Sequence, residues 1–209
     1  MVETPRSPRL RIDLGRALAP GTRVEIELGC GEGKKPGRIG VDVRDLPAVD
    51  VVADLNLGLP FLPDRSVDAI HAHHVFEHID AFEALLADCL RVLRDDGRLH
   101  VEVPHFTNPL AFSDYTHRRF FGLYTFQYFV PPHLQRSRKV PSYRPDLALR
   151  ILSERLVFRG GSGKPGILHR AVGRLVNSSA RMQELYEERF AYWVPCYEIR
   201  LALTPHREG

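Results

Sequence analysis

The sequence predicts a single α/β domain built on a doubly wound, mostly parallel β-sheet. Short apolar segments rich in Val and Ile recur along the first half of the chain, and Gly, Pro or Asp bounds each of them. Their continuous apolar character is typical of parallel strands that are buried on both faces of a sheet. The chain has 209 residues, of which 44% are hydrophobic, and this is enough for one domain with a full core.

The expected elements follow in order along the chain. A flexible segment, 1–20, is expected to precede the single domain, 21–209. Five strands of similar character are expected at 24–28, 39–43, 50–54, 67–72 and 98–103. The clearest helix follows a candidate N-cap, Asp80, and has apolar side chains at helical spacing over 81–93. The C-terminal part is expected to form a strand near 156–158, helices over about 166–190 and a last strand at 197–203.

Two connections between the early strands are unusually short. Gly33 and Asp42 are only nine residues apart, whereas parallel strands normally need a crossover of about a dozen residues or more. The next link, 44–48, is shorter still. We therefore expect reduced helices in the first half of the fold, and apolar sheet surface that the terminal segments or a second subunit must cover.

Charge and cysteine content exclude several classes of protein. The net charge is only +3, despite a pI of about 8.9, and the basic residues are scattered, so no nucleic-acid partner is expected. No apolar run approaches the ~20 residues that span a bilayer, so no membrane partner is expected. The three cysteines are widely spaced, which indicates neither a disulfide framework nor a zinc knuckle and fits a reducing cytoplasm.

The most informative segment runs from a short apolar strand into a glycine-rich turn, Val-Glu-Ile-Glu-Leu-Gly-Cys-Gly-Glu-Gly at 24–33. The glycines allow a tight turn and a close approach of a ligand to the main chain. The dinucleotide fingerprint G-x-G-x-x-G would need glycine where Lys34 stands. The carboxylate of Glu27, just before the turn, would repel a pyrophosphate but suits a cation. The pattern therefore favours a ligand with adenosine and a positive charge over NAD or FAD.

Two more carboxylates follow the next strands. Asp42 is placed to accept hydrogen bonds from a ribose diol, and Asp54 to accept one from an adenine amino group. The glycine-rich turn, these two strands and the segments 67–78 and 90–104 follow one another in the order found in the class I S-adenosylmethionine (SAM)-dependent methyltransferases, which the chain therefore resembles. The likeness is greatest to the small-molecule, methyltransferase type 11-like group, and it covers residues 22–105 well and the rest loosely.

The resemblance implies a seven-stranded, Rossmann-like methyltransferase fold with a helical C-terminal cap. It implies SAM as cofactor, with S-adenosyl-L-homocysteine (SAH) as product. It also implies that the last two strands pair as an antiparallel hairpin, so the residues between them, 162–195, are expected as a cap or interface insertion. The positions that the resemblance assigns to the cofactor are Glu27, Gly29, Cys30, Gly31, Gly33, Asp42, Val43, Asp54, Leu55, His73 and His74.

A second insertion is expected on the substrate side, at 106–140. Nine of the 19 aromatic residues lie within 106–129, beyond the fifth strand, where doubly wound folds bind their ligands. The candidate substrate-binding residues there are Phe106, Tyr115, Arg118 and Phe121. The stretch Asp-Tyr-Thr-His-Arg-Arg-Phe-Phe at 114–121 resembles a pattern found after the fifth strand of related methyltransferases.

This stretch supplies the catalytic candidates. A histidine titrates near neutral pH, so His117 is the first choice for a general base that removes a proton from an acceptor hydroxyl. Asp114 would orient it, and His105 is the second choice. The alternative is an aromatic, basic loop that merely folds onto the domain.

Seven of the ten histidines lie between His71 and His117. One interpretation is a metal site or an acid–base cluster. The favoured one, for His71 and His100, is that of strand histidines buried with hydrogen-bond partners. No H-x-x-x-H or H-E-x-x-H spacing supports a metal, so none is expected. The Glu77-His78 pair either supports a loop over the cofactor or caps a helix start.

The predicted function is methyl transfer from SAM to a small-molecule acceptor, with a hydroxyl oxygen as the favoured atom. The alternatives are N-methylation, methylation of RNA or protein, and a SAM-binding protein without activity. A homodimer is also expected, because the short connections leave apolar sheet surface that needs cover. The 166–193 region is expected to take part, since it carries aromatic residues of the kind found at interfaces: Tyr186, Phe190, Tyr192 and Trp193.

Overall fold

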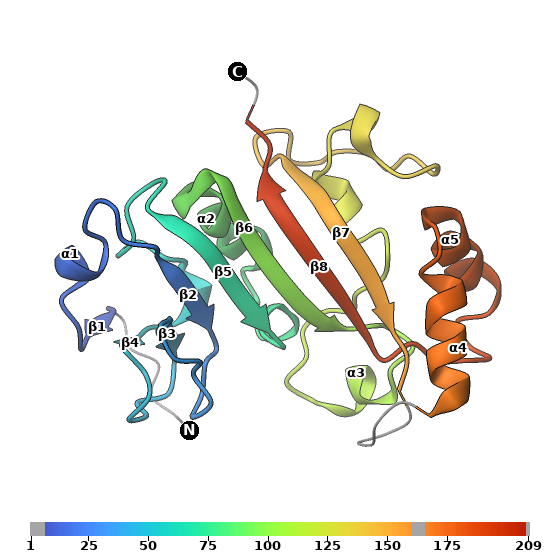
Figure 1. Cartoon of the computed structure of the whole chain (residues 1–209), viewed down its shortest axis with the longest axis horizontal. Coiled ribbons are helices and arrows are strands. Elements are labelled where there is room, and N and C mark those ends of the chain that lie inside the picture. Colours follow the sequence, from blue (N-terminus) through green and yellow to red (C-terminus); the bar gives the residue numbers. More distant parts are fainter. Residues whose placement is uncertain (1–6, 160–165, 208–209) are drawn as a thin grey trace.

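The computed structural model describes residues 7–159 and 166–207 and is built on one eight-stranded sheet (Figure 1). The strand order is β1-β4-β3-β2-β5-β6-β8-β7. The strands are β1 (Arg9–Leu10), β2 (Glu25–Leu28), β3 (Ile39–Asp42), β4 (Val51–Val52), β5 (Val67–His73), β6 (Leu93–Pro104), β7 (Leu149–Val157) and β8 (Glu198–Pro205). The α-helices are α1 (Leu14–Ala17), α2 (Phe82–Val92), α3 (Pro109–Ser113), α4 (Ile167–Val176) and α5 (Ala180–Arg189). The 3-10 turns are η1 (Leu55–Leu57), η2 (Phe76–His78), η3 (Phe126–Phe129) and η4 (Pro132–Leu134).

The pairing of the strands confirms the predicted α/β class. β2 pairs in parallel with both β3 and β5, and the parallel region continues to β4 on one side and β6 on the other. β8 pairs antiparallel with β6 and β7, so the last two strands form the antiparallel edge that was expected. The predicted count of seven strands is wrong by one. The extra strand, β1, comes from the segment 1–20 and pairs antiparallel with β4, so part of the segment expected to be flexible has regular structure.

The short early connections have the predicted consequence. No helix of the described chain joins β2 to β3 or β3 to β4, and only η1 lies between β4 and β5. The first full helix is α2, which buries Phe82, Leu85, Leu86 and Cys89. Its N-cap is Ala81, which lacks a capping side chain, and not Asp80 as expected. Instead, the side-chain oxygen of Asn56 accepts hydrogen bonds from the backbone N–H groups of Asp80 and Ala81.

One face of the central strands is polar. α2 lies behind the sheet in Figure 1, and no helix of the described residues covers the front of β5 and β6. On the polar face, the His71 ring stacks on His100 with centroids 4.9 Å apart and pairs with Glu25 at 3.0 Å. Burial, the main cause, lowers the pKa of both histidines. The expectation that the missing helices leave apolar sheet surface is therefore wrong, because ionic and histidine pairs occupy this face.

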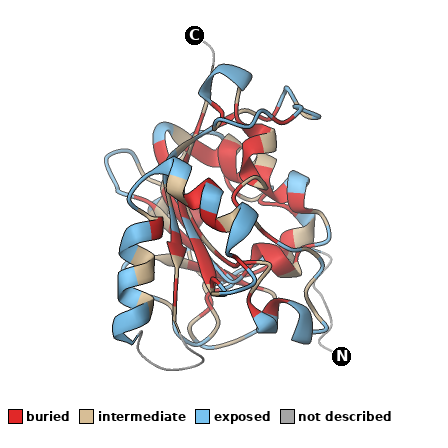
Figure 2. Ribbon diagram, turned by 90° about the vertical axis from the view of Figure 1, so that its right-hand side faces the viewer, coloured by how far each residue is buried: buried red, intermediate tan, exposed pale blue. Residues whose placement is uncertain are grey.

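The insertion between β7 and β8 contains α4 and α5, as predicted from the length of the segment. The two helices lie beside the edge strand β7 (Figure 1), and the outward side of α4 is exposed (Figure 2). Residues 162–165 of this insertion lie outside the described part. No helix within 7–159 and 166–207 has the length and apolar character needed to cross a bilayer.

Candidate functional site

A cleft of about 360 Å³ opens where the parallel strands β2, β3, β4 and β5 end. Doubly wound folds bind ligands at this edge of the sheet, because the strand order reverses there. The lining residues come from the loops after these strands and are Gly29, Asp42, Val43, Asp54, Leu55, Asn56, His74, Val75, His78 and Ile79. Asn56, Val75, His78 and Ile79 were not among the predicted cofactor positions.

The glycine-rich turn shapes one wall of the cleft. Gly29 has φ +61° and Gly31 has φ +54°, both in the left-handed region that favours glycine. A Cβ atom on Gly29 would lie 2.7 Å from Cγ2 of Val75, which also lines the cleft. By contrast, a Cβ atom on Gly33 would meet no heavy atom within 4 Å. Position 29 therefore needs glycine for two reasons: its backbone is left-handed, and a Cβ atom there would clash with Val75.

Asp42 stands at the end of β3 and is only 7% exposed. One of its carboxylate oxygens accepts a hydrogen bond from the Gly31 N–H at 2.8 Å, and the other from the Arg44 N–H at 2.8 Å. A carboxylate oxygen has two lone pairs, so each oxygen retains one for a ligand. The local backbone thus fixes the carboxylate in place at the cleft.

Asp54 is held in a similar way at the start of η1. Its Oδ1 accepts hydrogen bonds from the backbone N–H of Asn56 at 2.9 Å and from the side-chain amide of Asn56 at 3.0 Å. The Asn56 side chain then reaches the start of α2. The two residues form one rigid polar corner of the cleft.

Several predicted cofactor residues lie outside the lining of the cleft: Glu27, Cys30, Gly31, Gly33 and His73. Glu27 accepts a hydrogen bond from the Lys35 N–H at 3.0 Å and lies 3.4 Å from an Arg38 nitrogen, so it holds the far end of the glycine-rich loop. Cys30 packs with Val49 and Val52, and burial raises the pKa of its thiol to about 11.

His74 lines the cleft with an unusual backbone. Its φ of +54° is rare for a residue that is not glycine. Its Nδ1 lies 3.0 Å from Glu77, and its Nε2 lies 3.7 Å from Glu102. The Glu102 carboxylate and then that of Glu77 raise the pKa of His74 to about 9. His73 points to the polar face of the sheet, where Glu102 lies 3.7 Å away.

His117 lies next to the cleft, because it packs against His78. The two rings meet edge to face with centroids 4.8 Å apart, and His78 lines the cleft. Nδ1 of His117 donates to the Ala111 carbonyl at 3.0 Å, and Nε2 lies 3.7 Å from Oδ2 of Asp114. The structure therefore brings His117 and Asp114 together, although the separation exceeds a hydrogen bond.

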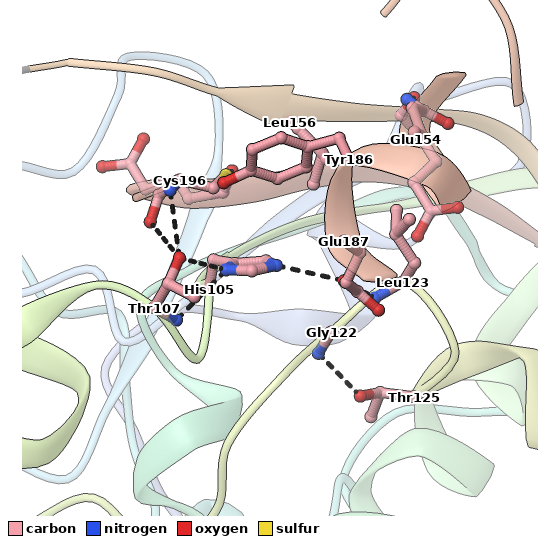
Figure 3. A network of polar contacts seen from close by, with 12 residues as sticks. His105, Thr107, Gly122, Leu123, Thr125, Glu154, Leu156, Tyr186, Glu187 and Cys196 are labelled. Atoms are coloured by element: carbon pink, nitrogen blue, oxygen red, sulfur yellow. Dashed lines mark hydrogen bonds and ion pairs between the residues drawn. The ribbon is translucent and has the colours of Figure 1, made fainter. Parts of the chain in front are cut away.

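His105, the second base candidate, is placed differently. It is 0% exposed and belongs to a buried network (Figure 3). Its Nε2 lies 3.0 Å from the Glu187 carboxylate, and its Nδ1 lies 2.7 Å from the Thr107 hydroxyl. Thr107 in turn contacts the backbone of Cys196. His105 does not line the cleft, so its position is that of a structural histidine and corrects the expectation of a base.

The four candidate substrate residues are dispersed. Phe121 is 0% exposed within the core, which removes it from direct contact with a ligand. Tyr115 is 91% exposed, and Arg118 pairs with Asp80 at 3.3 Å. Phe106 packs on the rings of His105 and Tyr192. None of the four lines the cleft.

Comparison with known proteins shows what part of the chain is similar to. A family model described as a methyltransferase domain matches residues 38–101. Two curated proteins of Mycobacterium tuberculosis, each named as a probable S-adenosylmethionine-dependent methyltransferase, are 34% identical over 114 residues. That match covers 46% of this chain, and it spans only 40% of the length of each relative. Over these residues the chain is similar to SAM-dependent methyltransferases.

Solved structures share the fold. A SAM-dependent methyltransferase from Archaeoglobus fulgidus has a TM-score of 0.55 at 19% identity, over 88% of this chain and 86% of that one. The 1,6-didemethyltoxoflavin-N1-methyltransferase of Burkholderia thailandensis, solved with 1,6-didemethyltoxoflavin and SAH, has a TM-score of 0.52 at 12% identity. That alignment covers 88% of this chain and 71% of the neighbour. At these identities the likeness establishes the fold.

Proposed function

We propose that this protein is a methyltransferase that transfers a methyl group from SAM to a small-molecule acceptor. The observation that carries the proposal is the cleft at the ends of β2 to β5, with Gly29 and Asp42 on its walls. SAM presents an adenine, a ribose diol and a sulfonium-bearing amino acid. The fixed Asp42 carboxylate suits the ribose diol, and the Asp54–Asn56 corner suits the adenine amino group. Leu55, Val75 and Ile79 add apolar surface beside them.

The residues outside the cleft lining act on this site indirectly in our proposal. Glu27 holds the glycine-rich loop through Lys35 and Arg38, and Gly31 donates its N–H to Asp42. Both therefore fix the shape of the wall that receives the donor. Cys30 and Gly33 belong to the glycine-rich loop but lie outside the cleft lining, and His73 lies on the polar face of the sheet, so none of the three offers a polar group to the cleft.

Methyl transfer from a sulfonium is an in-line displacement, in which the methyl carbon leaves sulfur as it bonds to the acceptor. The chain mainly has to align donor and acceptor and exclude water. For a hydroxyl acceptor, we propose that His117 activates the oxygen by taking its proton at Nε2. The Ala111 carbonyl orients the ring through Nδ1, and the Asp114 carboxylate, 3.7 Å from Nε2, stabilises the charged ring that forms. The products are the methyl ether, SAH and the proton held by the histidine. The hydrogen bond from Nδ1 to the Ala111 carbonyl supports this role, since it leaves the lone pair at Nε2.

One of the solved structures supports a second candidate for the methylated atom. The Burkholderia neighbour is named as an N1-methyltransferase with a small molecule bound. This supports a small acceptor, and it keeps nitrogen as the second candidate for the methylated atom. An acceptor nitrogen that is already nucleophilic would need orientation but no base.

We further propose a homodimer in the cytoplasm. The 166–193 region exposes Ile167 at 80%, Tyr192 at 81% and Trp193 at 85%, and exposed apolar patches of this kind mark interaction surfaces. Tyr186, named above for this interface, is instead buried and donates its hydroxyl to the Val194 carbonyl at 2.7 Å. The three cysteines are free, which fits a reducing compartment.

An acceptor screen tests the proposed activity. Purified chain is incubated with SAM that carries a labelled methyl group and with a panel of hydroxylated and amine-bearing small molecules. We expect label transfer to at least one hydroxyl compound together with an equal amount of SAH. Transfer only to amines would identify nitrogen, and not oxygen, as the methylated atom. SAH binding without transfer to any acceptor class, including RNA and protein, would identify a non-catalytic SAM-binding protein.

A further inference from the structure

Three potential ligands for a metal ion meet beside the cofactor cleft. Glu77, His78 and His117 each place one donor atom within 4.8 Å of the other two. His78 itself lines the cleft. This meeting of residues was not expected from the sequence, where the histidine spacing matched no metal motif. From this geometry we infer a binding site for one divalent first-row transition-metal ion, such as zinc, at Glu77, His78 and His117.

The hydrogen bonds of His117 leave its other nitrogen free to ligate. A carbonyl oxygen only accepts, so the contact with Ala111 requires a proton on Nδ1 of His117. The neutral ring then carries its lone pair at Nε2. Metal-ligating histidines usually donate their second ring N–H in this way, to a backbone carbonyl or a carboxylate.

The same argument fixes the tautomer of His78. The Thr116 hydroxyl lies 2.6 Å from Oδ1 of Asp114, which as a carboxylate oxygen only accepts, so the hydroxyl proton points there. The Thr116 oxygen must therefore accept from Nδ1 of His78, 2.9 Å away. Nε2 of His78 is left with the lone pair. Both histidines thus have the proton arrangement of a metal ligand.

Glu77 provides the independent observation that a ligand belongs here. The residue is 0% exposed, and its Oε1 is bonded to His74 at 3.0 Å. Its Oε2 is buried without a hydrogen-bond partner in the described part of the chain. An unpartnered buried carboxylate oxygen is costly, and a metal ion would satisfy it.

The size of the cluster suits such an ion. Three atoms within 4.8 Å of one another share a point no more than about 2.8 Å from each, whereas zinc ligands lie at about 2.0–2.2 Å. Each donor atom therefore has to move inward by less than about 1 Å. Two histidines and one carboxylate are a common set for catalytic zinc, and such a site keeps a position for water or an acceptor oxygen.

A second group of possible ligands, His74, Glu102 and Glu198, does not support the same inference. Nε of Arg200 lies 2.8 Å from Glu102, and Arg159 pairs with the buried Glu198. Arginine already neutralises both carboxylates, so a cation has little to gain there.

This metal site rests on the proposed function. An ion bound here would activate the acceptor, in place of the metal-free His117 ring. The test of this site does not depend on activity. Metal-stripped chain is titrated with Zn²⁺ by equilibrium dialysis and with Co²⁺ by visible absorption, for wild type, His117→Gln, His78→Gln and the exposed-surface control His133→Gln. We expect one ion per wild-type or control chain, and affinity at least about 10-fold weaker in the other two variants.

Two results would overturn the site: no stoichiometric binding by wild type, or equal affinity in wild type and His117→Gln. Loss of binding in His71→Gln but not in His117→Gln would place the ion on the histidine row of the sheet and would also overturn it. If the variants fail to fold, anomalous diffraction at the zinc edge from wild-type crystals decides the location. SAH titration of the same samples keeps the two proposals apart, because donor binding without zinc binding rejects only the metal site.

Discussion

The rings of His78 and His117 lie edge to face with their centroids 4.8 Å apart, and this contact joins the cofactor cleft to the segment after β6. His78 lines the cleft, whereas His117 belongs to the loop that follows α3. The contact therefore places the candidate acceptor-activating residue one side chain away from the proposed donor.

The two glycines of the turn give a matched test of the cleft. Gly29→Ala should abolish measurable SAH binding, because the new methyl group would lie 2.7 Å from Val75 in a left-handed backbone. Gly33→Ala should bind SAH as wild type does, since its Cβ meets nothing within 4 Å. Calorimetric titration of both folded variants checks this. Equal affinities would show that the wall formed by Gly29 and Val75 does not contact the donor.

His117→Ala tests the acceptor side. Loss of a positioned base, or of an equivalent activating group, lowers turnover by ~10²–10⁴-fold. We expect the loss in turnover with a hydroxyl acceptor, while SAH affinity stays unchanged because His117 does not line the cleft. Initial rates with the acceptor from the screen provide the measurement. Full activity of the variant would exclude His117 and leave orientation as the main contribution.

His105 should behave as a structural residue. His105→Ala removes buried hydrogen-bond partners of Glu187 and Thr107, and unsatisfied buried groups cost about 1–3 kcal/mol each. The free energy of unfolding, measured in guanidinium chloride, should fall by at least this amount, while His133→Ala at an exposed position should leave it unchanged. An unaltered unfolding free energy in His105→Ala would contradict the buried network of Figure 3.

The proposed dimer predicts a mass of two chains in light scattering at micromolar concentration. The double change Leu168→Asp and Trp193→Ser should yield a monomer, because it removes two exposed apolar side chains from the 166–193 region. Tyr143→Ser, which alters an exposed aromatic outside this region, should leave the dimer intact. A wild-type monomer at this concentration would reject the proposal.

Much of the fold was predictable because it depends on local sequence. The apolar runs around Ile26 and Ile70 have the character of buried parallel strands, and the short links after Gly33 leave no room for a helix. The polar face was not predictable, since it depends on cross-strand neighbours. His71 and His100 meet only when β5 and β6 align. The alternation of polar residues in β5 is the signal that could have indicated a face without a helix.

The site, like the fold, could be predicted only in part. Asp42 and Asp54 follow strands whose carboxyl ends meet at one edge, and both line the cleft. His105 was the second candidate after His117, because both lie after the fifth predicted strand. What separates them is a partner 82 residues away, Glu187, which fixes His105 in the interior. Such long-range contacts leave no trace in local spacing.

Calorimetric titration with SAH and, separately, with NAD⁺ tests most directly whether the cleft binds SAM. The wild-type chain should bind one SAH and show no measurable affinity for NAD⁺. Asp42→Ala should weaken SAH binding at least about tenfold, because hydrogen bonds to a charged group contribute ~1.5–3 kcal/mol each, while the exposed-site control Asp96→Ala should bind as wild type does. Failure of the folded wild-type chain to bind SAH, or a preference for NAD⁺, would show that the cleft is not a SAM site.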